Sequence, residues 1–124
     1  MKAINTQNAP AAIGPYSQAI EAGNMVFVSG QLPIDPATGE FAPGGADAQI
    51  KQSLTNVSAI LTQAGLSLKN VVKTTIFMAD MADFAAVNEV YKTFFAEPFP
   101  ARSAVAVKQL PKNALVEVEV IAVK

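Results

Sequence analysis

Residues 47–94, DAQIKQSLTNVSAILTQAGLSLKNVVKTTIFMADMADFAAVNEVYKTF, decide the fold of this chain. Apolar side chains recur every three or four positions from Asp47 onward, which predicts an amphipathic helix that ends at Gly65. Residues 70–78 are apolar and rich in β-branched side chains, and this composition predicts a central strand. Asp80 is suited to cap a second helix, which presents another apolar stripe. The stretch therefore predicts a helix, a strand and a second helix in that order.

Shorter strands flank this stretch on both sides. Residues 17–22 and 25–30 predict a hairpin around Gly23-Asn24, and residues 103–108 and 115–123 predict two further strands. A chain of 124 residues fits one domain, residues 1–124. This order of elements favours an α+β fold with both helices on one face of the sheet. The two helical stripes consist of Ile50, Leu54, Val57, Ile60, Leu61 and Ala64, and of Phe84, Val87, Tyr91 and Phe94.

The last predicted strand has two different faces, because successive side chains of a strand point in opposite directions. One face is apolar throughout and the other mixes two carboxylates with apolar side chains: Val116, Val118, Val120 and Ala122 against Leu115, Glu117, Glu119, Ile121 and Val123. Hydrophobic residues also make up 51% of the chain, against 15% charged residues. Apolar surface of this kind is usually covered by a partner. We therefore expect a homo-oligomer in which a subunit packs on the mixed face.

Charge and hydropathy exclude several classes of function. The formal net charge is −1 and the sequence pI is about 5.3. No basic stripe is present to neutralise phosphates, so we expect no nucleic-acid partner. No apolar run approaches the roughly 20 residues that span a bilayer, so we expect no membrane partner. The polar start, Met1 to Thr6, lacks the apolar segment of a signal peptide. A cytoplasmic location is the expectation.

The absence of two residue types limits the chemistry further. The chain has no cysteine, which excludes disulfides, thiolate nucleophiles and cysteine metal sites. It has no histidine, so the commonest general base and a Ser-His-Asp triad are missing too. Any catalysis must use carboxylates, lysines, hydroxyls, two tyrosines, one arginine and the backbone. We expect no bound metal and no cofactor.

Arg102 and Glu117 are the two candidates for chemistry. Arg102 is the only arginine, and its planar guanidinium suits a carboxylate that accepts two parallel hydrogen bonds. Its position alone favours the alternative, a surface salt bridge, for example to Glu119. Glu117 could serve as a general acid or base if burial brought its pKa towards neutrality. A solvated glutamate is the alternative, although the apolar neighbours on its face favour partial burial.

Other polar residues have equally open interpretations. Tyr16 follows a rigid Gly-Pro turn and could project into a cleft or be an ordinary half-buried ring. Ser29 and Gly30 end a strand, where a hydroxyl and a backbone amide can approach a ligand, or where the chain simply turns. Asn88 would form a helix-to-strand hydrogen bond or contact a ligand. Lys73 is either a surface lysine or a cation of the site.

Two blocks of sequence make the chain resemble the RidA (YjgF/YER) family of reactive-intermediate deaminases. The first block is NAPAAIGPYSQA at residues 8–19, continuing to Ser29-Gly30-Gln31. The second contains Pro100-Ala101-Arg102-Ser103 and ends in Val116-Glu117-Val118-Glu119. Between them, Val72-Lys73-Thr74-Thr75 and the segment from Asp83 to Asn88 also match. The resemblance spans essentially the whole chain.

The resemblance implies an architecture and a role for each matching residue. The fold would be chorismate-mutase-like, a mixed sheet with two helices on one face, assembling as a homotrimer around a central β-barrel. Arg102 would bind the substrate carboxylate, and Glu117 would activate water or pass a proton to the leaving nitrogen. Tyr16, Ser29, Gly30 and Asn88 would shape the pocket, with residues from two neighbouring chains. Ala104 stands where many members have cysteine, and its backbone carbonyl could still position water.

The implied function is cofactor-independent hydrolysis of 2-iminobutanoate and 2-iminopropanoate to 2-keto acids and ammonia. Such an enzyme would protect pyridoxal-phosphate enzymes from reactive enamines. The alternative is a non-catalytic or regulatory trimer that binds a small carboxylate, which would need Arg102 but not Glu117. A ribonuclease or translation inhibitor fits poorly with an acidic chain that has one arginine and no histidine.

Overall fold

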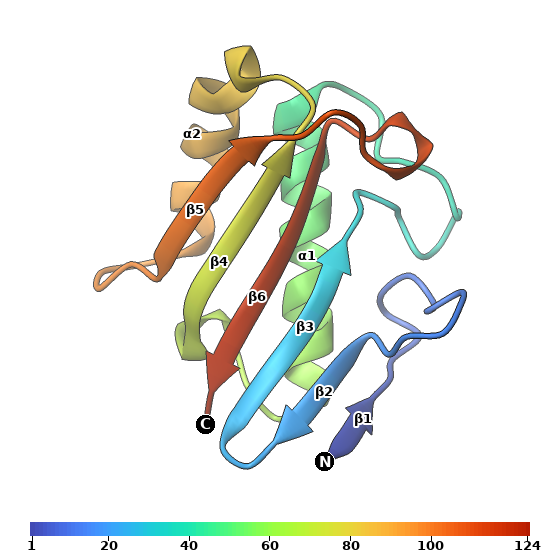
Figure 1. The fold of residues 1–124 in the computed structure, drawn as a ribbon, viewed down its shortest axis with the longest axis vertical. Helices are drawn as coiled ribbons and strands as arrows, with labels where there is room; N and C mark the ends of the chain where they lie inside the picture. The colour runs from blue at the N-terminus through green and yellow to red at the C-terminus, as the bar shows by residue number, and fades with distance from the viewer.

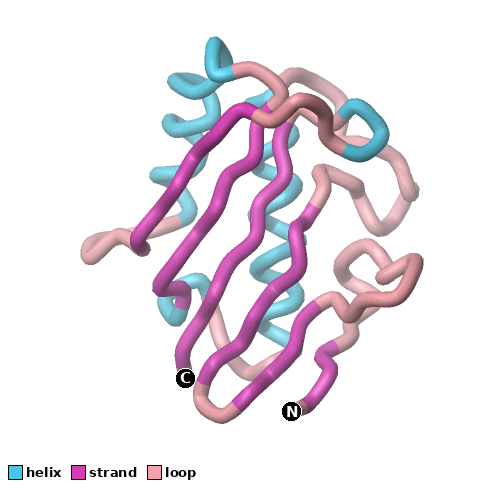
Figure 2. Tube along the Cα trace, in the orientation of Figure 1, coloured by secondary structure: helices cyan, strands magenta, loops and turns pink.

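The computed structural model describes residues 1–124 as one mixed sheet with two helices behind it (Figure 1). The strand order in the sheet is β1-β2-β3-β6-β4-β5. Both helices lie on one face, and loops connect the ends of the strands (Figure 2). The strands are β1 (Lys2–Ile4), β2 (Ala19–Ala22), β3 (Met25–Gln31), β4 (Val71–Met78), β5 (Ala101–Ala106) and β6 (Val116–Val123), and the helices are α1 (Ala46–Gln63) and α2 (Phe84–Phe94). The α+β fold with two helices on one face, predicted from sequence, is confirmed.

Chain connections explain why the sheet is mixed. The β2–β3 hairpin turns at Gly23, whose positive φ of 60° favours glycine. The C-terminal strand β6 then inserts between β3 and β4 and runs antiparallel to both. Strands β4 and β5 are parallel because α2 carries the chain back across the sheet between them. Residues far apart in sequence therefore become neighbours at β6.

Several details differ from the sequence-based expectations, among them the start of β2, which lies at Ala19 rather than at residue 17. β1 was not predicted, because three residues are too few to show a period of two. β5 begins at Ala101 rather than at residue 103, so Arg102 lies inside a strand. Asp80 does cap a helical segment, but this is the short 3-10 turn Met81–Asp83 that leads into α2.

The hydrophobic core lies between the sheet and α1. The apolar face of β6 is entirely buried, as its alternation predicted: Val116, Val118, Val120 and Ala122 are each no more than 2% exposed. α1 buries the predicted stripe from Ile50 to Leu61 against this face. α2 adds Val87 and Tyr91, and its apolar stripe faces the same core. Burial of these side chains is the main stabilising term for so small a domain.

No element of the chain covers the opposite face of the sheet, which is turned towards the viewer in Figure 1. On it, Phe27 of β3 and Val105 of β5 are 42% and 45% exposed. Ile121 and Val123 of β6 are only half-buried. The chain also contains no helix that is long and apolar enough to cross a membrane.

Asn56 connects α1 to the loop that follows β3. Its side chain is fully buried, and its Nδ2 donates to the carbonyl oxygens of Leu32 at 3.2 Å and Ile34 at 2.9 Å. Its Oδ1 accepts a hydrogen bond from Gln52 at 2.9 Å. These bonds fix the loop at the end of β3, next to Gly30. An amide here has a structural role that a helix-forming residue of the same size could not replace.

We expect Asn56→Ala to lower the free energy of unfolding by about 2–3 kcal/mol, because two carbonyl oxygens lose their buried donor. Urea denaturation followed by circular dichroism measures this change. Lys51→Ala is the matched control, since Lys51 is exposed on the same helix, and it should change stability by less than about 0.5 kcal/mol. Equal stability of the two variants would contradict the structural role of Asn56.

Candidate active site

The side chain of Arg102 lies on the helix side of the sheet, against α2. Its Nη1 donates to Oδ1 of Asn88 at 2.6 Å. Its guanidinium carbon lies 4.8 Å from the ring centroid of Tyr91 and 5.3 Å from that of Phe84. Both distances are within the range of a cation–π interaction. The residue remains exposed to solvent and forms no salt bridge, so the surface ion pair to Glu119 considered from the sequence is not present.

Asn88 forms one of the two contacts expected from the sequence, a helix-to-strand hydrogen bond. It lies half-buried on α2, and its carbonyl oxygen is the acceptor for Arg102. The side-chain NH₂ group of Asn88 has no partner within the chain. The amide therefore orients Arg102 and keeps two donors for other contacts.

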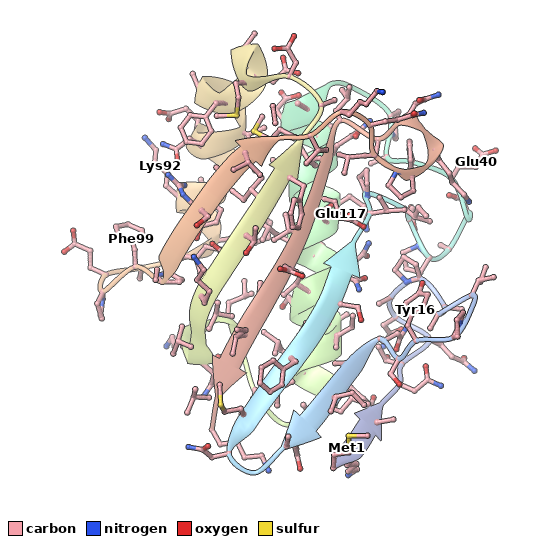
Figure 3. The ribbon with its side chains drawn as sticks, in the orientation of Figure 1. Met1, Tyr16, Glu40, Lys92, Phe99 and Glu117 are labelled. Carbon is pink, nitrogen blue, oxygen red and sulfur yellow. The ribbon has the colours of Figure 1, made fainter.

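Glu117 lies on the opposite, open face of the sheet, as the second residue of β6 and close to the end of β3 (Figure 3). Its carboxyl lies directly over the backbone of Gly30, where an added β-carbon would be only 2.9 Å from Cδ and Oε2 of Glu117. Any side chain at position 30 would collide with this carboxyl, so glycine provides the space that it occupies. Partial burial raises the pKa of Glu117 above its ordinary value of 4.5, and the nearby charge of Glu119 raises this pKa further.

Hydrogen bonds of Ser29 join the segment that follows Tyr16 to the end of β3. The hydroxyl of Ser29 donates to the carbonyl of Ser17 at 2.6 Å, and the Ser29 amide donates to the carbonyl of Gln18 at 2.9 Å. These bonds bind the segment after Tyr16 to the end of β3, where pairing with β6 shifts register. Tyr16 is 53% exposed in the loop before β2 (Figure 3). Ser29 thus holds the two segments together rather than presenting a free hydroxyl.

The structure places Arg102 and Glu117 on opposite faces of the sheet. Asn88 lies beside Arg102 and Gly30 beneath Glu117, whereas Tyr16 lies exposed in the loop before β2, whose following residues Ser29 bonds to the end of β3. Strand spacing and register put the α-carbons of Arg102 and Glu117 about 14 Å apart, with one intervening strand. Their side chains point away from each other, so one chain does not bring both groups to the same small ligand.

The two remaining candidates lie on different faces. Ala104 of β5 pairs with Ile76 and is half-buried against the core, on the same face as Arg102. Lys73 of β4 donates from Nζ to the hydroxyl of Ser103 at 3.1 Å. Ser103 alternates with Arg102 along β5, so this contact lies on the open face.

Sequence reasoning missed the two aromatic rings beside Arg102. Phe84 and Tyr91 were assigned to the apolar stripe of α2, where they belong by spacing. Together with Asn88 they occupy positions i, i+7 and i+4 of one helical face. An asparagine inside an aromatic stripe is the signal that could have shown that this face receives a polar group.

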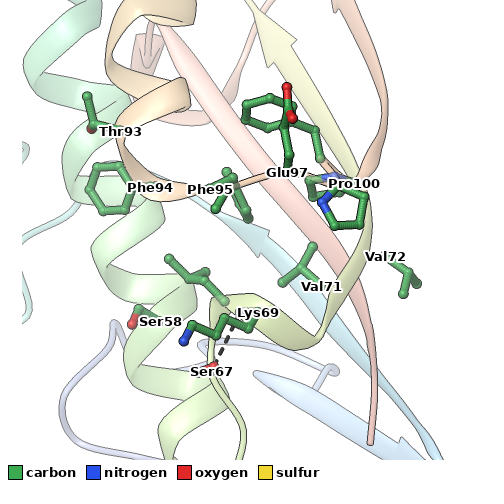
Figure 4. Close-up of a pocket in the computed structure, with 14 residues that line it drawn as sticks. Ser58, Ser67, Lys69, Val71, Val72, Thr93, Phe94, Phe95, Glu97 and Pro100 are labelled. Carbon is green, nitrogen blue, oxygen red and sulfur yellow. Dashed lines mark hydrogen bonds between the residues drawn. The ribbon is translucent and has the colours of Figure 1, made fainter.

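A groove of about 850 Å³ lies elsewhere, between the loop after α2 and the start of β4 (Figure 4). Apolar residues such as Phe94 and Pro100 form much of its lining, and its charged lining residues are Lys69 and Glu97. It contains none of the residues predicted for the site. The structure also shows no cluster of three or more acidic side chains that could hold a metal ion.

Comparison with known proteins places these features in a family. Residues 6–124 match the sequence model of the endoribonuclease L-PSP (Ribonuc_L-PSP) family. The chain belongs to this YjgF/RidA family. A RutC family protein of Pyrococcus horikoshii is 55% identical over 98% of the chain and 96% of its own length. A protein of Escherichia coli K12 named 2-iminobutanoate/2-iminopropanoate deaminase is 53% identical over 99% of the chain and 98% of its own length.

Solved structures of this family have the same fold as the chain. The structure of E. coli TdcF with bound serine superimposes with a TM-score of 0.95 at 50% identity and covers 100% of the chain and 99% of TdcF. Family members that have different names therefore share one fold.

The surroundings of Glu117 lead to a titration prediction. We expect its pKa, measured from the carboxyl carbon by NMR, to lie above 4.5. Glu119→Gln should lower this pKa only in part, because burial is the larger cause. The folded state binds this proton more tightly than the unfolded chain, so the stability that Glu117 contributes is lost as the pH rises from 4.5 through the folded pKa. A pKa at or below 4.5 would contradict the assignment.

Proposed function

We propose that the chain hydrolyses small 2-imino (enamine) acids, such as 2-iminobutanoate and 2-iminopropanoate, to 2-keto acids and ammonia without a cofactor. One observation carries this proposal. The only arginine of the chain is oriented by Asn88 and two aromatic rings, exposed, and paired with no acidic side chain. A guanidinium held in this way is suited to a small carboxylate.

A site shared between two copies of the chain reconciles the placement of Arg102 and Glu117 on opposite faces. We propose a homotrimer in which the open faces of three sheets pack as a central barrel. The exposed Phe27 and Val105 and the half-buried Ile121 would then be covered. Arg102 lies on the edge strand β5, where it can face a neighbouring copy. Arg102 and Asn88 of one chain would meet Tyr16, Gly30 and Glu117 of the next.

The chemistry needs one activated water and one proton relay. The carbon of the C=N bond is electrophilic, and it accepts the oxygen of a water molecule that gives up a proton to Glu117. Glu117 passes this proton to the nitrogen, which gives a carbinolamine. Glu117 then takes the proton of the new hydroxyl group and passes it to the nitrogen as well, so that the C–N bond breaks, ammonia leaves and the C=O bond forms. Imine and water are consumed, and keto acid and ammonia are produced, with no electron transfer. A pKa of Glu117 raised above 4.5 by burial favours a carboxyl that both accepts a proton and returns it.

The other predicted residues would shape the pocket. Tyr16 and the Gly30 backbone would line it near the imine, and Ser29 would hold these two segments in place. Ala104 would offer its backbone carbonyl to a water molecule. Asn88 would act mainly by orienting Arg102, because its carbonyl oxygen already accepts from that side chain.

The named relatives support the enzyme over the alternative of a non-catalytic carboxylate-binding trimer. A protein 53% identical to the chain carries the deaminase name, and TdcF was solved with serine, a small amino acid that has a carboxylate. The family description also includes the word endoribonuclease. A net charge of −1 and the lack of histidine speak against RNA cleavage by this chain. A deaminase of this type would protect pyridoxal-phosphate enzymes from enamines.

The purified protein should speed the decay of 2-iminobutanoate generated in situ by a threonine dehydratase, measured as keto-acid and ammonia release. Arg102→Ala should abolish this activity with the fold intact. Arg102→Lys is the matched control, since it keeps the charge but loses the two-pronged geometry, and it should remain severely impaired. Glu117→Gln should still bind 2-oxobutanoate but lose about 10²–10⁴-fold in kcat. Equal decay with and without protein would refute the enzyme, and full turnover by Glu117→Gln would leave only the binding function.

Mixed oligomers test the shared site. Arg102→Ala and Glu117→Gln chains, each inactive alone, should recover about a quarter of wild-type activity when co-expressed in equal amounts, because each half-site is intact in about half of the chains. Light scattering should give three times the 13.0 kDa mass of one chain. Verified mixed oligomers without recovered activity would contradict a site shared between two chains.

A further inference from the structure

Arg102 is held by three side chains of one helical face. Phe84, Asn88 and Tyr91 are spaced by four and three residues along α2, so they form one stripe that faces β5. Asn88 accepts one N–H of the guanidinium, and the rings of Tyr91 and Phe84 lie within 4.8 Å and 5.3 Å of its central carbon. A guanidinium has five N–H donors, so most remain free for a ligand.

Tyr91 is the more firmly fixed of the two rings. It is only 4% exposed, and its hydroxyl lies 2.8 Å from the hydroxyl of Thr74, which is fully buried on β4. Its ring also packs on Phe95, with centroids 4.7 Å apart. Two contacts on different elements thus leave the ring little freedom. The side facing Arg102 is a rigid aromatic surface.

Thr74, which bonds to Tyr91, and Arg102 are direct neighbours in the sheet. Thr74 of β4 pairs with Arg102 of β5 in the parallel register. The pairing of β4 with β5 therefore fixes both partners of the cation–π contact. Thr74 holds the ring of Tyr91, and the side chain of Arg102 extends across that ring. A long arginine side chain on an edge strand would otherwise sample many rotamers, at a cost in binding entropy.

We propose that Tyr91, held by Thr74, is a positioning residue that keeps the guanidinium of Arg102 ready for the substrate carboxylate. The kinetic consequence of this inference rests on the proposed function. The ordering of the Arg102 side chain can be observed whether or not the chain is a deaminase. Phe84 is half-buried at 5.3 Å and contributes a second, looser ring. Tyr91 itself touches no reacting atom.

The single arginine makes the test direct, because its Nε–H gives the only arginine side-chain signal in a ¹H–¹⁵N NMR spectrum. In the ligand-free wild type this group should approach the rigidity of the backbone, with an order parameter near about 0.85. In Tyr91→Leu the order parameter should fall below about 0.6, while Tyr91→Phe, which keeps the ring, should stay close to wild type. Phe94→Leu is the control, since it removes an aromatic side chain of the same helix that does not contact Arg102.

Thr74→Val is measured in parallel, so that the question is decided even if Tyr91→Leu does not fold. It removes the hydroxyl partner of Tyr91 while keeping the shape of the side chain, and it should also lower the order of Arg102. An Arg102 signal that is mobile in the wild type, or equally ordered in a folded Tyr91→Leu or Thr74→Val protein, would overturn the inference.

Kinetics separate positioning from a merely structural role. Loss of a cation–π contact should raise KM by about 2- to 30-fold in Tyr91→Leu with kcat nearly unchanged, because the carboxylate contact is made in the ground state and the transition state alike. A structural defect would instead lower the active fraction, and so kcat, at constant KM. An unchanged KM in the folded variant would overturn the inference. A wild type without deaminase activity would refute the proposed function alone, since the NMR result still decides the positioning of Arg102.

Discussion

The fold depends on the alternation of side chains along β6, the strand that closes the sheet between β3 and β4. Four buried side chains, from Val116 to Ala122, bind the sheet to α1. Each of the three buried valines contributes about 1.5–3 kcal/mol, so this one strand contributes substantially to the stability of the core. The intervening positions must then point away from the helices. Glu117 is consequently placed on the open face by the same pattern that builds the core.

This constraint divides the candidate active site. Arg102 leans towards α2 on the edge of the sheet, whereas Glu117 lies over Gly30 on the other face. A pleated sheet is a barrier between its two faces, so neither side chain can reach the other within one chain. Apolar residues are exposed on the same face as Glu117, and a second copy of the chain packed against this face could bring its Arg102 close to Glu117. Oligomerisation would then be part of the site as well as of stability.

The two halves of the site are prepared by different physical means. Around Arg102 the chain places aromatic rings and an amide oxygen, which orient a positive charge without neutralising it. Around Glu117 it places partial burial and a second carboxylate, which both raise the pKa. In the proposed function, the first half would bind an anion and the second would hold and release a proton.

The sequence alone determined the periodic features of this protein. Helical spacing located α1 and α2, alternation assigned both faces of β6, and the arginine-to-glutamate signature indicated the family, because each is local in the chain. β1 was too short to show a period, and the start of β5 was misplaced by two residues. Only the tertiary structure revealed that Tyr91 and Phe84 hold Arg102, that Thr74 anchors Tyr91, and that Arg102 and Glu117 lie on opposite faces. These relations depend on the insertion of β6 and the parallel pairing of β4 with β5, which join residues distant in sequence and leave no local pattern.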